Sequence, residues 1–314
     1  MTPILTVTLN PTVDLSIATA HVQSERKLRC TNPAEDPGGG GINVSRAIAA
    51  MGGQSTAFVA LGGATGTKVA ALLAAQGIGL VPFAAPGETR QSLTVTDEST
   101  GEQYRFVMPG PDWSAADVGQ VLEQIARAMP ESGIIVLSGS QPPGFPEDFP
   151  ARLASLVAPH HARVFLDTSG PALRQLLDGR HQAADLLRMD DLEAEDLAGH
   201  PLPARTDTAD FAQHLVAKGL AHAVLIARGA EGNVLATASH RWFATAPKVP
   251  VVSKVGAGDS FVAGFTLALS RGAPLPDALR YGAAAAAAAV MTPATELCRG
   301  TDVEALLDLE VSAL

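Results

Sequence analysis

The sequence predicts an α/β protein built on a mostly parallel sheet with helices on both faces. Short β-branched runs bounded by Gly, Pro or Asp alternate with Ala- and Leu-rich runs at helical spacing over most of the 314 residues. Alternating strands and helices favour a parallel sheet because each crossover helix must lie on one of its faces. With 46% apolar residues, the chain is long enough for one large domain, or for one domain with a small appendage.

Each element is assigned from its spacing and its flanking residues. The runs expected as buried strands are Ile4–Leu9, Ser55–Ala60, Ile134–Ser138, Val164–Asp167 and Ala223–Ile226. The runs expected as helices are Asn43–Met51, Thr67–Gln76, Ala115–Met129, Phe149–Val157 and Ala209–Lys218. From Val255 onward we expect helices, with Pro274 starting one and Thr301 capping another.

Two segments interrupt this alternation, at approximately residues 14–34 and 88–108. Both contain strand-like stretches of alternating polarity with no helix between them, which indicates half-exposed antiparallel strands. A sheet of few strands needs covering, so we expect a small lid whose other face packs on a second subunit.

Charge and composition exclude several classes of protein. The formal net charge is −10 without a run of basic residues, so neither nucleic acid nor a membrane is an expected partner. Cys30 and Cys298 are far apart in sequence, the eight histidines lack metal spacing, and no basic region with an apolar stretch follows Met1. We therefore expect a cytoplasmic protein.

The sharpest motif is Gly256-Ala257-Gly258-Asp259-Ser260, which precedes an apolar helical run. Small residues that open a helix present free N–H groups and the positive end of the helix dipole to an anion. A carboxylate in such a turn suits a general base that accepts a proton from an attacking hydroxyl while the amides hold a phosphoryl group. An ordinary helix start with an acidic first turn is the alternative.

A second glycine-rich turn, Gly38 to Gly41, precedes Asn43 and matches neither the P-loop nor the dinucleotide fingerprint. It permits close approach of the backbone to a polyhydroxyl ligand, and the Asn43 amide both donates and accepts hydrogen bonds. Asp14 follows the first strand, at the end where parallel sheets bind ligands. The alternative is a flexible turn.

Charged residues supply two further expectations. Lys27, Arg29, Arg90 and Arg105 fall in the lid segments and suit capture of a phosphate monoester, although each alone fits a solvated surface. Asp190 and Glu193 begin a helix and either hold Mg²⁺ through water or cap that helix.

The two glycine motifs together resemble those of the ribokinase-like PfkB carbohydrate kinases, in the expected order and separation. Within that family the chain is most similar to the PfkB-type bacterial 6-phosphofructokinases, over essentially its whole length. The segments that carry this closer similarity are 27–31, 62–66, 101–110, 138–140 and 142–144.

The resemblance implies a three-layer α/β/α sandwich spanning residues 1–314, with a β-lid that pairs two subunits into a homodimer. It implies Asp259 as catalytic base, with the amides of Gly256, Ala257 and Gly258 as an anion hole. It implies ATP as co-substrate and Mg²⁺ steered by Glu193 and, through water, Asp190, and leaves a monovalent cation open. The implied sugar phosphate site consists of Asp14, Lys27, Gly38, Gly39, Asn43, Arg90, Arg105 and Ser140. The implied nucleotide site consists of Arg188, Asp190, Ala227, Arg228, Gly229, Gly232 and Lys254.

Departures from the family pattern gather in the nucleotide half. Arg188-Met189-Asp190 stands where relatives carry Lys-Pro-Asn, and Ala227-Arg228-Gly229 stands where Ser-Leu-Gly is usual. Lys254 replaces a Thr or Ser, and Ala294-Thr295 replaces Gly-Thr. We therefore expect altered donor binding, with Arg228 and Lys254 as replacement phosphate contacts.

Three activities remain open at this point. Transfer of phosphoryl from ATP to fructose 6-phosphate is favoured by the segments Lys27–Thr31 and Gly101–Gly110. A 1-phosphofructokinase or a tagatose-6-phosphate kinase is the first alternative, since Thr6–Pro11 is equally typical of those enzymes. A phosphosugar-binding protein that has lost donor affinity is the second alternative.

Overall fold

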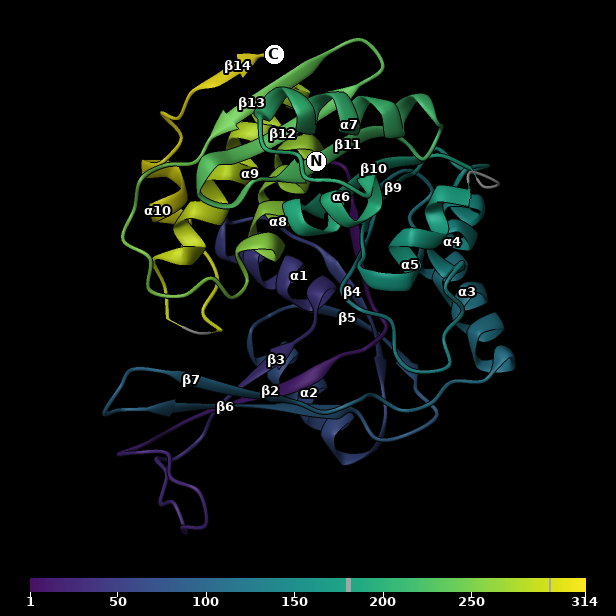
Figure 1. Cartoon of the computed structure of the whole chain (residues 1–314). Helices are drawn as coiled ribbons and strands as arrows, with labels where there is room; N and C mark the ends of the chain where they lie inside the picture. Colours follow the sequence, from purple (N-terminus) through teal and green to yellow (C-terminus); the bar gives the residue numbers. More distant parts are fainter. Residues whose placement is uncertain (179–181, 294) are drawn as a thin grey trace.

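The computed structural model describes residues 1–178, 182–293 and 295–314. Within them, a ten-stranded sheet forms the centre of the molecule (Figure 1). In spatial order its strands are β14 (Val311–Ala313), β13 (Arg241–Thr245), β12 (Gly232–Thr237), β11 (Ala221–Ala227), β10 (Ala184–Asp190), β9 (Arg163–Asp167), β8 (Ile134–Ser138), β1 (Ile4–Thr8), β4 (Thr56–Leu61) and β5 (Gly79–Ala84). Neighbours from β11 to β5 pair in parallel, and β12, β13 and β14 add antiparallel pairs at one edge. The predicted mostly parallel sheet is confirmed.

Helices cover both faces of this sheet, which makes three layers. One face carries α1 (Gly40–Ala50), α2 (Gly63–Ala75), α8 (Ala257–Ser270), α9 (Leu275–Val290) and α10 (Gly300–Ala305). The other carries α3 (Ala115–Ala128), α4 (Phe149–Val157), α5 (Gly170–Gln175), α6 (Asp191–Ala198) and α7 (Arg205–Ala217). Short 3₁₀ turns, η1 (Leu176–Asp178) and η2 (Gly229–Glu231), complete the order.

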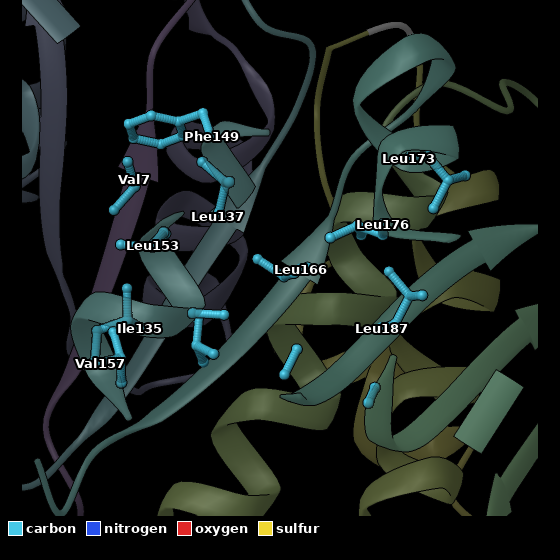
Figure 2. Packing of buried hydrophobic residues seen from close by; sticks show 14 of the residues in the cluster. Val7, Ile135, Leu137, Phe149, Leu153, Val157, Leu166, Leu173, Leu176 and Leu187 are labelled. Carbon is cyan, nitrogen blue, oxygen red and sulfur yellow. The ribbon is translucent and has the colours of Figure 1, made fainter. Parts of the chain in front are cut away.

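The core is divided by the sheet because successive strand residues point to opposite faces. On β8, Ile135 and Leu137 belong to the cluster under α3 and α4, whereas Ile134 and Val136 belong to the cluster under α1 and α8. Figure 2 shows the first cluster, where Phe149 and other α4 side chains lie over β1, β8 and β9. Fully buried strands of this kind appear in sequence as continuous apolar runs, which is why each of the five predicted strands overlaps an observed one. The strands β5, β12 and β13 were not among those predicted.

A second, four-stranded sheet lies beside the main one. Its strands in order are β3 (Ala34–Gly38), β2 (Thr12–Thr19), β6 (Arg90–Asp97) and β7 (Gln103–Val107). We expected antiparallel strands here, and the β2–β6 pair is parallel instead, because the chain passes through β4 and β5 of the main sheet before it returns. The glycine motif at Gly38 ends β3, so the small sheet leads directly into α1.

Two predictions for the C-terminal region are wrong. Arg299, in extended conformation, is the N-cap of α10, and Thr301 lies inside the helix. The region also ends in β14, which pairs with β13, whereas we expected helices only. Pro274 does stand at the N-cap of α9, as expected for a residue that cannot donate a backbone hydrogen bond. Ala294, one of the departures in sequence, lies outside the described residues.

Candidate active site

The carboxyl ends of the parallel strands meet along one edge of the main sheet, where open α/β sheets bind their ligands. Asn10 follows β1, Ser140 follows β8, and Asp167, Asp190 and Ala227 are the last residues of β9, β10 and β11. Since the strands lie in the order β11, β10, β9, β8 and β1, the predicted nucleotide residues lie on one side and the predicted sugar residues on the other.

The two glycine motifs meet above this edge through one hydrogen bond. The Asn43 side-chain amide, on α1, donates to Oδ2 of Asp259, on α8, over 2.9 Å. Asp259 lies in the first turn of α8, beside the free amides of that helix start. Two motifs separated by more than two hundred residues in sequence therefore form one site, as the sequence led us to expect.

The electrostatic surroundings of Asp259 raise its pKa to about 6, first because the carboxylate is buried and then because Asp167 lies nearby. The hydrogen bond from Asn43 and the positive charge of Arg188 oppose this rise. A carboxylate with such a pKa is ionised at neutral pH and still basic enough to accept a proton from a hydroxyl during reaction.

The turn before α8 depends on glycine at position 256. Gly256 is the N-cap and adopts φ 75°, in the left-handed region, and a Cβ there would lie 2.6 Å from the Leu297 side chain. The turn directs the first amides of α8 toward the same space as Asp259. These amides, contributed by residues 256–258, form an anion-binding helix start.

Arg188 and Asp167 form an ion pair next to this helix start. Arg188 Nη1 donates to Asp167 Oδ1 over 3.0 Å, and the Ser138 hydroxyl donates to the other Asp167 oxygen over 2.8 Å. A Cβ on Gly258 would lie 3.0 Å from Arg188 Nη2, so the guanidinium lies directly under the anion-binding turn. Asp167 was missed in the sequence, although its position as the last residue of a predicted strand marked it.

Two of the predicted sugar residues, Asp14 near the start of β2 and Gly38 at the end of β3, lie against each other. The Gly38 backbone approaches Asp14 so closely that a Cβ there would lie 2.1 Å from Oδ2 of Asp14. Burial raises the pKa of Asp14, and the positive charges of Arg90 and Arg105 counteract the rise, which places these cations within electrostatic reach. Gly39 is the N-cap of α1.

Asn10 is a second residue that the sequence reasoning missed. Its carbonyl accepts from Nε and Nη2 of Arg90 at 3.3 and 3.2 Å, and its Nδ2 donates to the Ser140 hydroxyl over 3.4 Å. Its Oδ1 is buried and has no hydrogen-bond partner in the described part of the chain. Buried polar atoms are normally paired, so this acceptor is suited to a hydroxyl of a ligand.

Lys27 is not brought to this site. It lies in the exposed loop between β2 and β3 that projects below the small sheet in Figure 1. Asp97 holds the base of this loop by accepting hydrogen bonds from the Val22 amide and from Ser99, and these bonds lower the pKa of Asp97.

Arg228 does not face the nucleotide side, so the prediction that it contacts phosphate is wrong. Its guanidinium is buried and donates to the carbonyls of Leu202 and Pro203, to the Thr208 hydroxyl and to the Glu231 carboxylate. Its Nε also donates to Glu231, and its Nη1 also donates to the Ala204 carbonyl, so each nitrogen of the guanidinium has a partner. Arg228 thus fixes the loop between α6 and α7.

The remaining nucleotide residues line the end of β11 and the loop before α8. Gly229 begins η2 directly after Ala227 and Arg228, and the carbonyl of Gly232, the first residue of β12, accepts the Arg228 amide. Lys254 is exposed, two residues before the anion-binding turn. Of the two cations expected to contact phosphate, Lys254 is the one whose side chain is exposed.

Asp190 and Glu193 cap α6 reciprocally. Asp190 Oδ1 accepts from the Glu193 amide, and Glu193 Oε2 accepts from the Asp190 amide, both over 2.8 Å. The capping alternative is confirmed. Burial and the neighbouring carboxylates of Asp190 and Asp167 raise the pKa of Glu193. No cluster of three or more metal-binding side chains occurs among the described residues.

The family model described as "pfkB family carbohydrate kinase" matches residues 7–301. The chain belongs to this family. It is therefore a sugar phosphotransferase, as its two glycine motifs led us to expect. Within the described ranges, no helix has the length and apolar character needed to span a membrane.

Curated pfkB relatives include two kinds of phosphofructokinase. The ATP-dependent 6-phosphofructokinase isozyme 2 of Mycobacterium tuberculosis is 39% identical over 310 residues, covering 98% of this chain and 89% of the relative. The Escherichia coli enzyme of the same name is 38% identical over 305 residues, covering 97% of each. The 1-phosphofructokinase of Bacillus subtilis is 32% identical over 279 residues, covering 89% of each.

Solved structures agree with the fold. The structure of Escherichia coli phosphofructokinase-2 with potassium matches with a TM-score of 0.92 at 37% identity over 98% of both chains. A complex of that enzyme with fructose-6-phosphate has a TM-score of 0.90 at 36% identity over 98% of both chains. Arabidopsis thaliana ribokinase, at 20% identity and a TM-score of 0.73, covering 98% of this chain and 99% of its own, shares the fold, so the predicted ribokinase-like sandwich is confirmed.

Proposed function

We propose that this pfkB kinase, as a single domain, transfers the terminal phosphoryl group of ATP to fructose 6-phosphate. The observation that carries the proposal is the Asn43–Asp259 hydrogen bond, which brings the first motif onto the carboxylate beside the α8 anion-binding turn. The relatives named 6-phosphofructokinase and the fructose-6-phosphate complex of one of them support this acceptor.

In the proposed reaction, Asp259 accepts the proton of the acceptor hydroxyl as the new O–P bond forms, and the bond to the departing nucleotide breaks. The amides of residues 256–258 and the Arg188 guanidinium stabilise the charge on the phosphoryl oxygens. Asp14, Asn10 and Arg90 orient the sugar phosphate on the other side of Asp259.

The residues at the β10 end fit Mg²⁺. Glu193 and Asp190 supply hard carboxylate oxygens, and because both side chains also cap α6, we propose that they reach the ion through water. When bound, Mg²⁺ neutralises charge on the nucleotide phosphates. The potassium complex of the E. coli relative makes K⁺ dependence a useful additional measurement.

A homodimer is the proposed assembly, joined through the small sheet. Strand pairing places Ile17, Val95, Tyr104, Leu93 and Phe106 on the same face of the small sheet. Helix α2 contacts this sheet at β2 and β3. Phe106 is 54% exposed, so a second copy would bury an apolar surface. The description of one E. coli structure as a tetrameric inhibited form supports self-association. Lys27 would then meet a sugar phosphate only from the partner's lid. We propose that the enzyme acts in the cytoplasm.

Transfer from Mg-ATP to fructose 6-phosphate, measured for wild type and Asp259→Asn, tests this function. Loss of the base should reduce kcat by about 10²–10⁴-fold while sugar phosphate still binds. Preference for fructose 1-phosphate in the same assay would favour 1-phosphofructokinase activity, the activity for which the B. subtilis relative is named. Preference for tagatose 6-phosphate would favour a tagatose-6-phosphate kinase. Calorimetric binding of sugar phosphate without any nucleotide binding or turnover would instead indicate a binding protein.

A further inference from the structure

Arg46 is a buried cation that the proposed mechanism does not use. It lies on α1 one turn after Asn43, and its side chain is 11% exposed. Burial lowers the pKa of Arg46, and the nearby carboxylate of Asp36 opposes this change. Removing the partners of such a charge would destabilise the folded protein.

The Arg46 guanidinium joins three parts of the molecule. Nη2 pairs with Asp36 over 2.9 Å, and Nη1 donates to the Pro37 carbonyl over 3.2 Å, both on β3 of the small sheet. Nη1 also lies 3.5 Å from the Thr295 carbonyl, and the Thr295 hydroxyl donates to the other Asp36 oxygen over 2.7 Å. Arg46 therefore connects the small sheet to α1 and to the segment whose Leu297 packs on Gly256.

The same guanidinium lies 3.5 Å from the side-chain oxygen of Asn43, whose nitrogen donates to Asp259. The two ends of an amide have opposite hydrogen-bonding character. A cation at the oxygen end favours the orientation in which the NH₂ group faces Asp259. The reversed amide would present an oxygen to the carboxylate and destabilise its ionised form.

We propose that Arg46 is a positioning residue that sets the Asn43 amide toward Asp259 and so keeps the base ionised, while Asp36 ties this arrangement to the small sheet. The inference rests on the proposed function, since it assumes that Asp259 is the base. The other groups that face Asp259 are Asp167, Arg188 and Asp14, and Asp14 also acts on Arg46. A substitution at Arg46 replaces none of these groups, but loss of its charge also acts on Asp14, and Arg46→Lys keeps that charge.

The test compares pH profiles of kcat/KM for fructose 6-phosphate in wild type, Arg46→Met, Arg46→Lys and Gln76→Leu. Losing the Asn43 hydrogen bond should move the acid limb to higher pH by about half to one unit in both Arg46 variants, with the rate recovering at alkaline pH. Arg46→Lys keeps a charge for Asp36, but its one nitrogen cannot occupy both the position from which Nη2 pairs with Asp36 and the position from which Nη1 contacts Asn43. Arg46→Lys should therefore shift the acid limb of the pH profile with a smaller change in KM than Arg46→Met. It also provides the test if Arg46→Met does not fold.

Gln76→Leu is the matched control because Gln76 accepts from Arg46 Nε over 2.9 Å at the outer side of the cluster. It removes one Arg46 contact without touching Asn43, so its acid limb should coincide with that of wild type. Folded Arg46 variants whose acid limb also coincides with wild type would overturn the inference and leave Arg46 a purely structural role. Wild-type turnover and its loss in Asp259→Asn, measured in the same series, test the reaction itself, so the two failures are distinguishable.

Discussion

At the scale of single residues, the site uses burial to give identical chemical groups different tasks. Asp259 and Asp167 lie near each other at the sheet edge, but Asp167 is paired with Arg188 and Ser138, whereas the hydrogen bond on Asp259 in the described part of the chain comes from Asn43. The paired carboxylate holds the Arg188 cation in place. The less compensated one is left with a raised pKa and is suited to proton transfer.

The raised pKa of Asp259 predicts an acid limb in the rate. A base must be deprotonated, so kcat/KM should fall as the pH drops below the Asp259 pKa of about 6 and should be level above it. Rates measured from mildly acidic to mildly alkaline pH test this. The residual rate of Asp259→Asn is the control, because a limb that persists there belongs to the substrate phosphate.

The two cations that the sequence assigned to the nucleotide site, Arg228 and Lys254, should behave differently on substitution. Arg228→Leu leaves the buried Leu202 carbonyl and Thr208 hydroxyl, the Pro203 carbonyl and Glu231 without their donor, so it should lower the free energy of unfolding by about 3 kcal/mol. Lys254→Thr should leave stability unchanged and raise KM for ATP. Urea unfolding and donor kinetics on both variants measure this. A stable Arg228→Leu enzyme with a selectively raised KM for ATP would contradict the structural role.

At the scale of elements, the start of α8 depends on the backbone conformation of Gly256. Gly256 adopts a left-handed conformation, and a Cβ there would lie 2.6 Å from the end of the Leu297 side chain. The helix start can hold an anion only if this turn directs its amides outward, so local backbone conformation and function are linked here.

Gly256→Ala should therefore damage catalysis more than stability. The left-handed conformation costs about 1–2 kcal/mol for a residue with a Cβ, so we expect the turn to relax away from it and its amides to lose their direction. We expect kcat to fall on the order of 10²-fold, as when an anion-hole donor is lost. Gly272, beyond the other end of α8, is the control because it has φ 87° and no atom within 4 Å of a built Cβ. Gly272→Ala should show similar strain and wild-type kcat, and equal losses of kcat in the two variants would refute the argument.

At the scale of the whole molecule, the small sheet leaves its edge strand β7 and two apolar side chains uncovered. β7 is exposed along its length, and Phe106 and Val107 are 54% and 62% exposed. An exposed apolar strand at the edge of a sheet favours pairing with another chain. The same sheet carries Asp14, so the proposed self-association and the proposed acceptor binding would share one element.

Phe106→Glu should dissociate the proposed dimer. A charge in the apolar face opposes its burial against a second copy, so sedimentation should show a shift to monomer together with weaker fructose 6-phosphate binding. Leu314→Glu adds the same charge at an exposed apolar position beside β14, at the far edge of the main sheet, and should leave the assembly intact. If Phe106→Glu sediments like wild type, the small sheet does not form the interface.

The sequence by itself determined the alternating elements, the parallel sheet and the two motifs that meet at Asp259. These are local properties, because a buried strand is written as an apolar run and a ligand-binding turn as a run of small residues. Only the tertiary structure decided what each charged side chain contacts. Arg228 and Lys254 look alike in sequence, yet one is buried among carbonyls and the other is exposed, and Asp167 and Arg46 gain importance only through partners distant in the chain. These contacts depend on how segments distant in the chain pack together, and residue type and spacing alone do not reveal that packing.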